Sequence, residues 1–99
     1  MASVSIVESN PGFGDVIHYT FVYDQALKAN QALLVKVECT QGGALVCAGF
    51  ALPARGDFDF TLGPTPSWSG GGANGKLLLI VSTGGRFKTV ATDTFSVAP

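Results

Sequence analysis

The fold is decided by one stretch in the first half of the chain, Ala32-Leu33-Leu34-Val35-Lys36-Val37-Glu38-Cys39-Thr40. Apolar and polar side chains alternate along most of it, which is typical of a β-strand with one buried face. The expected buried face consists of Leu33, Val35, Val37 and Cys39. The expected outer face consists of Lys36, Glu38 and Thr40. The next four residues, Gln41-Gly42-Gly43-Ala44, predict a reversal of the chain.

Similar short strands recur on both sides of this stretch, with turn signals between them. They are expected at residues 3–7, 16–23, 45–52, 57–62, 76–83, 86–91 and 94–97, the last two as one bent strand or as two. Residues 77–81 are apolar at every position, so both faces of that strand should be covered. Helical periodicity is nearly absent. We therefore expect a single all-β domain over residues 1–99, an immunoglobulin-like antiparallel β-sandwich of seven to eight strands, with a small barrel as the alternative.

The charge of the chain is low. Asp, Glu, Lys and Arg make up 13% of the residues, whereas soluble domains average about 25%. A poorly charged surface favours burial against neighbouring subunits; a neutral surface rich in Gly, Ser and Thr is the alternative. The net charge is −1 and the basic residues are scattered. Neither nucleic acid nor a membrane is therefore an expected partner.

No group of residues predicts catalysis or a cofactor. His18 is the only histidine, and it has no nucleophile beside it in the sequence. Together with the two cysteines it does not form a paired zinc-ligand spacing. The stretch Gly70-Gly71-Gly72-Ala73-Asn74-Gly75-Lys76 resembles a phosphate-binding loop, but Leu77 replaces the Ser or Thr that would follow, and a strand is expected where that loop needs a helix. We expect no enzyme, no metal and no cofactor.

Two short motifs in the middle of the chain have simpler interpretations. Asp57 and Asp59 lie on one face of an expected strand, where solvated carboxylates discourage pairing with another strand edge. The tripeptide Arg55-Gly56-Asp57 is the sequence that integrins bind, but a match this short is unspecific. We interpret it as a connector between strands.

Two features leave alternatives open. Cys39 and Cys47 would face each other if residues 42–44 form a hairpin tip, so a disulfide is conceivable; the absence of a secretory signal favours free thiols. In the loop of residues 63–72, Pro64 and Pro66 stiffen the chain around Trp68. Trp68 is either an exposed contact residue or a lid on the core.

Three motifs resemble one group of small proteins. They are V-x-V-x-C-x-Q-G-G at residues 35–43, F-T-L-G-P-T-P-S-W-S-G-G-G at residues 60–72 and A-T-D-T-F-S-V-A at residues 91–98. The chain resembles the short immunoglobulin-like virion proteins of tailed phages that infect actinobacteria, over roughly its last two-thirds. Some members carry a second cysteine soon after the tryptophan loop, whereas residues 73–76 hold none. The resemblance implies a protein without enzymatic activity that coats a capsid or tail.

The resulting functional prediction is a virion structural protein. It would be made in the host cytoplasm, bind the major capsid protein or a tail protein, and stabilise or decorate the particle as a capsid decoration or minor capsid or tail protein. Self-association into oligomers is also expected. The residues expected at the interface are Val4, Ile6, Pro64, Pro66 and Trp68. The alternative is an immunoglobulin-like recognition or carbohydrate-binding module for adhesion to a host surface.

Overall fold

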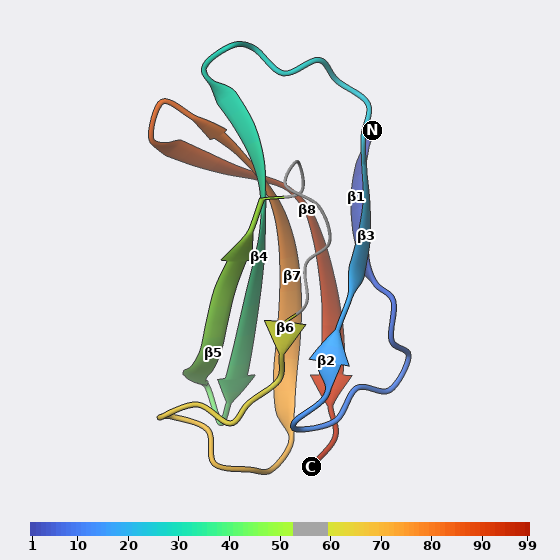
Figure 1. The fold of residues 1–99 in the computed structure, drawn as a ribbon, viewed down its shortest axis with the longest axis vertical. Coiled ribbons are helices and arrows are strands. Elements are labelled where there is room, and N and C mark those ends of the chain that lie inside the picture. The colour runs from blue at the N-terminus through green and yellow to red at the C-terminus, as the bar shows by residue number, and fades with distance from the viewer. Residues whose placement is uncertain (53–59) are drawn as a thin grey trace.

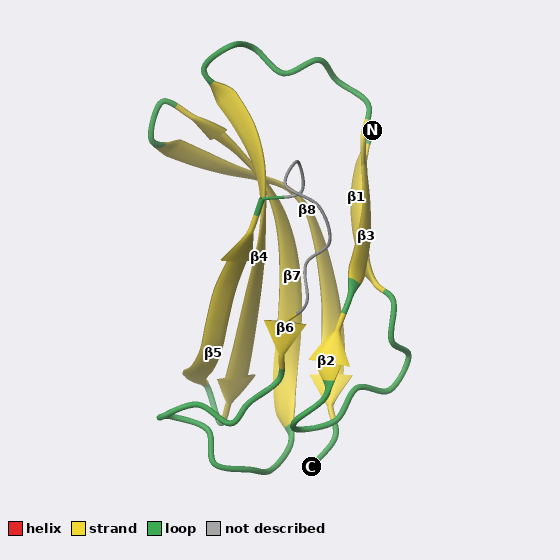
Figure 2. Cartoon of the chain, in the orientation of Figure 1, coloured by secondary structure: helices red, strands yellow, loops and turns green. Residues whose placement is uncertain are grey.

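Strands and loops make up all of residues 1–52 and 60–99, the part of the chain that the computed structural model describes (Figures 1 and 2). The strands are β1 (Ala2–Ile6), β2 (Val16–Ile17), β3 (Tyr19–Tyr23), β4 (Gln31–Gln41), β5 (Ala44–Ala51), β6 (Phe60–Thr61), β7 (Ala73–Thr83) and β8 (Arg86–Val97). The prediction of an all-β chain is confirmed. These residues include no helix that could cross a membrane.

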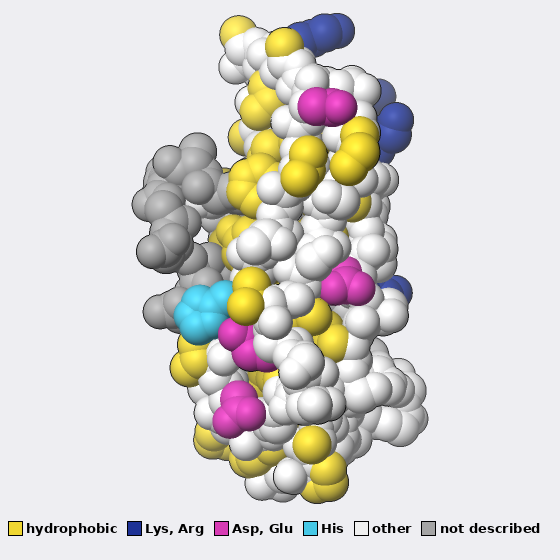
Figure 3. All heavy atoms as spheres, turned by 90° about the vertical axis from the view of Figure 1, so that its right-hand side faces the viewer, with side chains coloured by type: hydrophobic (Ala, Val, Ile, Leu, Met, Phe, Trp, Pro, Cys, Tyr) yellow, Lys and Arg dark blue, Asp and Glu magenta, His cyan; other side chains and the backbone are white. Residues whose placement is uncertain are grey.

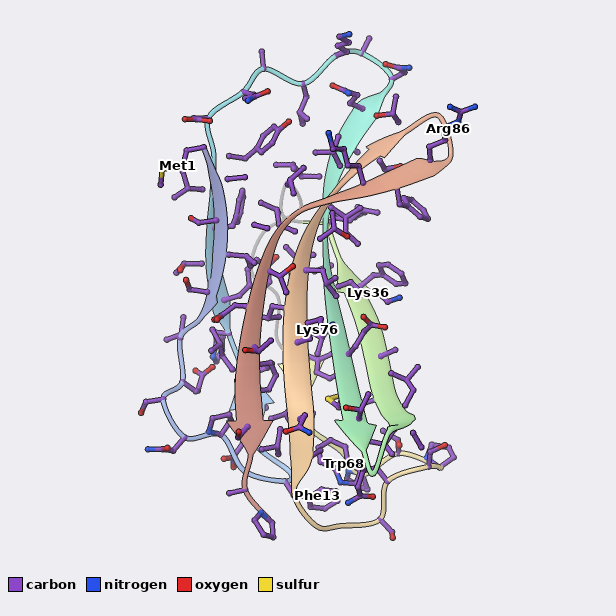
Figure 4. All side chains as sticks on the ribbon, turned by 180° about the vertical axis from the view of Figure 1, so that it is seen from behind. Met1, Phe13, Lys36, Trp68, Lys76 and Arg86 are labelled. Carbon is purple, nitrogen blue, oxygen red and sulfur yellow. A yellow bond between two sulfur atoms is a disulfide. The ribbon has the colours of Figure 1, made fainter. Side chains whose placement is uncertain are left out.

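The strands form one large sheet and two small ones, all antiparallel. The large sheet has the order β5-β4-β7-β8, and the small sheets pair β1 with β3 and β2 with β6. The small sheets lie nearer the viewer in Figure 1, whereas the large sheet lies nearer in Figure 4, which shows the molecule from behind. The arrangement is therefore sandwich-like, and one face of the large sheet points away from the small sheets.

Strand β4 is the centre of the large sheet and confirms the alternation of residues 32–40. Val35, Val37 and Cys39 are fully buried. The register places Val35 opposite Leu79 and Val37 opposite Leu77, so side chains from β4 and β7 stand in rows on the inner face. Buried residues of the other elements join them, namely Val4, Ile17, Val46, Cys47, Ala51, Leu62, Trp68 and Val97.

Residues 16–23 differ from the expected strand, residues 57–62 lie partly outside the described part, and residues 86–97 form one strand, which is one of the two alternatives expected. Residues 16–23 form two strands separated by His18, because β2 pairs with β6 and β3 pairs with β1. Residues 86–97 form the single long strand β8, which carries a register shift opposite Leu79 and Ile80. Of the strand expected at residues 57–62, only Phe60–Thr61 is seen, and residues 53–59 lie outside the described part.

The prediction that both faces of residues 77–81 are covered is confirmed for the inner face and only in part for the outer face. Leu77 and Leu79 are fully buried on the inner face. On the opposite face Ile80 is buried, whereas Leu78 is half-buried. The run therefore belongs to two apolar layers, one inside the sandwich and one on its outside.

Contacts between the layers come from both ends of the large sheet. Glycine is required at position 49 of β5, because a Cβ there would collide with the ring of Phe60 in the layer above. At β8, the Asp93 Oδ2 atom accepts a hydrogen bond from the backbone N–H of Ile6 in β1 (2.9 Å). The small sheets are thus attached to the edge strands of the large one.

Substitution of the adjacent residues Leu78 and Leu79 tests which face of β7 lies in the core. Leu79→Ala should lower the free energy of unfolding by about 2–5 kcal/mol, because it leaves a cavity in the core. Leu78→Ala should cost less than half as much, because Leu78 is half-buried on the outer face. Urea unfolding of both variants measures the difference. Equal losses would contradict the assignment of the two faces.

Candidate functional site

Trp68 lies in the core and seals one end of it. Its exposed fraction is 0%. The ring meets Phe13 edge-on with the ring centroids 5.1 Å apart, and its Nε1–H donates a hydrogen bond to the backbone carbonyl of Gly71 (3.1 Å). Two backbone hydrogen bonds of 3.0 Å join Trp68 to Thr65 and close the loop. Figure 4 shows Trp68 and Phe13 together at the end of the sandwich.

The predicted interface is therefore wrong at two residues. Trp68 is the core lid, because Phe13 and the loop backbone cover its indole. Val4 is also buried, because β1 turns it towards the core, and Ile6 is half-buried. Pro64 and Pro66 are exposed on the loop. Of the five predicted contact residues, the two prolines are exposed, Ile6 is half-buried, and Val4 and Trp68 are buried.

The glycine-rich stretch after Trp68 does not have the geometry of a phosphate-binding loop. The Gln41 side chain donates hydrogen bonds to the carbonyls of Gly70 (3.0 Å) and Gly72 (3.1 Å). Strand β7 begins at Ala73, so no helix N-terminus follows to face a phosphate. The stretch instead connects the Trp68 loop to the large sheet.

Cys39 and Cys47 form a disulfide, so the preference for free thiols is wrong. The residues lie directly opposite each other on β4 and β5, with their Cα atoms 4.8 Å apart. Such a separation allows a disulfide without movement of the backbone. The bond links adjacent strands of one sheet, next to the end that Trp68 seals.

His18 makes a local contact with Glu8. Its backbone N–H donates to Glu8 Oε1 (2.6 Å), and its ring Nδ1 lies 3.0 Å from Glu8 Oε2. Burial alone would raise the pKa of the Glu8 carboxyl, but the hydrogen bonds from His18 outweigh it and lower this pKa below its ordinary value of 4.5. The pair connects two loop-side segments of the N-terminal layer, and its geometry provides no nucleophile.

Other acidic motifs contribute no site in the described part. Asp57 and Asp59 and the tripeptide Arg55-Gly56-Asp57 lie outside it. Across residues 1–52 and 60–99, His, Cys, Asp and Glu side chains form no group of three that could hold a metal ion. The candidate contact surfaces in the described part consist of exposed apolar and polar side chains.

The outer face of the large sheet carries apolar side chains, two of which are strongly exposed phenylalanines. We call Leu34, Phe50, Leu78, Ile80 and Phe87 the outer apolar patch. Phe50 and Phe87 are 56% and 65% exposed. The register aligns Phe50, Lys36, Leu78 and Thr92 across the four strands. Leu34 and Ile80 form the next row, and Phe87 follows on β8. Sequence reasoning missed this patch, because Phe50 and Phe87 stand out only once the register places them on one face.

Charged groups lie within the outer apolar patch and beside it. Lys36 Nζ lies 5.4 Å from the centre of the Phe50 ring and 3.5 Å from Glu38 Oε2. Figure 4 shows Lys36 and Lys76 on this side of the molecule. Figure 3, which faces the side of β1 and β3, shows acidic side chains spread over that surface, with Lys and Arg at its upper end and along one margin. The two sides of the molecule thus differ in charge: lysines lie near the patch, and acidic side chains lie on the side of β1 and β3.

A polar trough lies on the large sheet beside the patch. Its volume is about 500 Å³. Six polar side chains line it: Glu38, Thr40, Asn74, Lys76, Thr94 and Ser96. The rows Glu38-Lys76-Thr94 and Thr40-Asn74-Ser96 cross three strands, so the trough has a rigid base. It offers hydroxyl, amide, carboxylate and ammonium groups to a hydrogen-bonding ligand.

Comparisons of this chain with protein-family models, with curated proteins and with solved structures find no match.

Reduction of the disulfide should destabilise the chain. Opening a link between residues eight apart in sequence frees loop entropy in the unfolded state worth about 2–3 kcal/mol. Urea unfolding with and without a thiol reductant measures the loss. The variant Cys39→Ala/Cys47→Ala should be insensitive to reductant. Two alkylated thiols in the denatured, unreduced wild-type chain would contradict the bond.

The contact between Glu8 and His18 predicts a dependence of stability on pH. Because the pKa of Glu8 is lower in the folded chain than in the unfolded one, ionised Glu8 stabilises the fold above pH 4.5. This contribution is lost as the pH falls below that value. Glu8→Gln should therefore be less stable than wild type at pH 7 and about equally stable near pH 3. Urea unfolding across this range tests it, and a difference that does not change with pH would contradict it.

Proposed function

We propose that this chain is a structural protein of a phage particle, which binds coat or tail subunits without catalysing a reaction. The resemblance of residues 35–43, 60–72 and 91–98 to small virion proteins suggests the type of particle. The outer apolar patch suggests how the chain would bind. In this proposal it decorates or stabilises the particle by burying that patch against a neighbouring subunit.

The observation that carries the proposal is the exposure of Phe50 and Phe87 on a rigid sheet. Aromatic side chains are frequent at the centres of protein interfaces, and charged residues are depleted there. Leu78 and Ile80 lie on the same face of β7, between β4 and β8. Lys36 lies within the patch and is paired with Glu38, whereas Lys76 lies beside the patch. A partner with an apolar surface and a carboxylate that faces Lys76 would therefore be complementary.

Two further properties agree with a place in an extracellular particle. The Cys39–Cys47 disulfide would persist outside the reducing cytosol. The charged fraction of 13% is low for a domain of this size. Such a surface is better suited to an assembly than to a free monomer.

The proposal includes an immunoglobulin-like arrangement of the strands. Antiparallel layers pack around one core, and that core contains a tryptophan and a disulfide. In immunoglobulin domains the disulfide crosses between the sheets, whereas here it joins β4 and β5 of one sheet. The proposed likeness therefore concerns the arrangement of layers and not the position of the bridge.

A recognition module for a host surface is the second candidate, and the polar trough favours it. Glu38, Asn74 and Lys76 could hydrogen-bond a saccharide, and the hydroxyl groups of Thr40, Thr94 and Ser96 extend the same row pattern. In this case the ligand would lie across β4, β7 and β8, below the outer apolar patch.

Substitutions in the outer apolar patch, with a control on the other layer, test whether the patch binds the particle. Phe50→Ser and Phe87→Ser should each weaken binding to particles prepared without this chain by about tenfold or more, because each removes a large apolar contact. Phe21→Ser is the matched control, since Phe21 is an exposed phenylalanine (38%) on β3 of the other layer. Co-sedimentation of purified protein with the particles gives the affinities.

A particle affinity that is unchanged by both patch variants would contradict the proposed contact. The recognition module would be favoured if wild type binds a host polysaccharide and if Asn74→Ala, but neither patch variant, loses that binding. Circular dichroism and unfolding midpoints of each variant verify that the fold is retained.

A further inference from the structure

Strand β5 ends the large sheet with an edge that lacks the usual protection. In the described part it pairs with β4 alone, and Figure 1 shows no strand beyond it. Residues 44–51 contain no charged residue and no proline. Natural edge strands usually carry such residues, because an open edge with unpaired backbone groups can pair with another strand.

The other end of the same sheet is different. Strand β8 carries Arg86, Lys88 and Asp93, and Asp93 holds the backbone of Ile6 in β1. That edge is therefore both charged and tied to a neighbouring strand. The contrast within a single sheet identifies β5 as the end that is open to pairing.

The open part of β5 is limited to its second half. The Thr65 hydroxyl donates a hydrogen bond to the carbonyl of Val46 (2.6 Å). A register shift at Cys39 and Thr40 makes Val46 the extra residue of a bulge. Residues 47–51 follow without interruption. A trough of about 300 Å³ runs beside this strand, between residues 45–48 and the loop residues Thr65, Pro66 and Ser67.

We propose that this edge binds a second copy of the same chain, strand against strand. Two β5 strands that pair antiparallel about Gly49 would place Ala48 of each copy opposite Phe50 of the other. Cys47 of each would then lie opposite Ala51. The contact is isologous, with a two-fold axis between the strands, which is the commonest symmetry of small oligomers.

The chemistry of the strand fits an identical partner. Ala48 and Phe50 are both on the outer face, since they pair with Glu38 and Lys36 of β4. In the proposed dimer, the small Ala48 of each copy would therefore lie beside the large Phe50 of the other. No like charges would face each other across the new ladder, because residues 47–51 carry none. In the next strand, Lys36 and Glu38 form an ion pair (3.5 Å) and so neutralise each other.

Pairing would join the two large sheets into one continuous surface. Phe50 of each copy would flank the axis, so the two outer apolar patches would become neighbours. The contact area of one strand edge is small, and the dimer should therefore exchange with monomer as concentration changes. This inference does not depend on the proposed particle, because pairing would occur between free chains.

Sedimentation velocity of the full chain, from about 10 µM to about 1 mM, tests the proposal. Wild type should change from monomer to dimer over this range. Ala48→Lys places a charge on the free edge, opposite Phe50 of the partner, and should weaken the dimer by about tenfold or more. Thr92→Lys makes the same change of charge on the same sheet face but on β8, so its dimerisation should match wild type.

A wild-type chain that stays monomeric throughout would overturn the proposal. So would an Ala48→Lys variant that dimerises like wild type, or a Thr92→Lys variant that is equally weakened, since either would place the contact elsewhere. Amide hydrogen exchange on wild type provides a reading that needs no variant. Protection that rises with concentration at residues 47–51 supports pairing, and its absence contradicts it.

Discussion

The burial of Trp68 is the interaction on which the rest of the structure depends. Its indole ring contacts Phe13 and is hydrogen-bonded to Gly71, and it holds the loop of residues 63–72 over the end of the core. The same loop reaches β5 through the bond from Thr65 to Val46. Full burial of an indole in a domain this small supplies a large share of its apolar contacts. It also leaves the indole ring inaccessible from outside.

The large sheet, by contrast, has one face in the core and one face on the surface. The inner face of this sheet makes the core with Val35, Val37, Leu77 and Leu79. Its outer face remains open and carries Phe50 and Phe87 among polar rows. A sheet with a covered face and an open face can present a rigid binding surface, because the buried side fixes the positions of the strands. The disulfide between β4 and β5 adds to that rigidity at the free edge.

Alternation within one strand was predictable from the sequence, and contacts between distant segments were not. Residues 32–40 show their buried face through local spacing, and β4 has that face. The split of residues 16–23 depends on two different partner strands, which no local pattern contains. The position of Trp68 depends on Phe13, 55 residues earlier in the chain. For the same reason the outer apolar patch became visible only through the pairing register of β4, β5, β7 and β8.

The proposed contact surface is tested most directly by hydroxyl-radical footprinting, read by mass spectrometry, of the chain alone and with phage particles of the proposed kind. If the outer face of the large sheet is the proposed contact surface, oxidation of Phe50 and Phe87 falls on binding, whereas oxidation of Phe21 stays the same. Protection of Phe21 with unchanged Phe50 and Phe87 would contradict it and place the contact on the N-terminal layer.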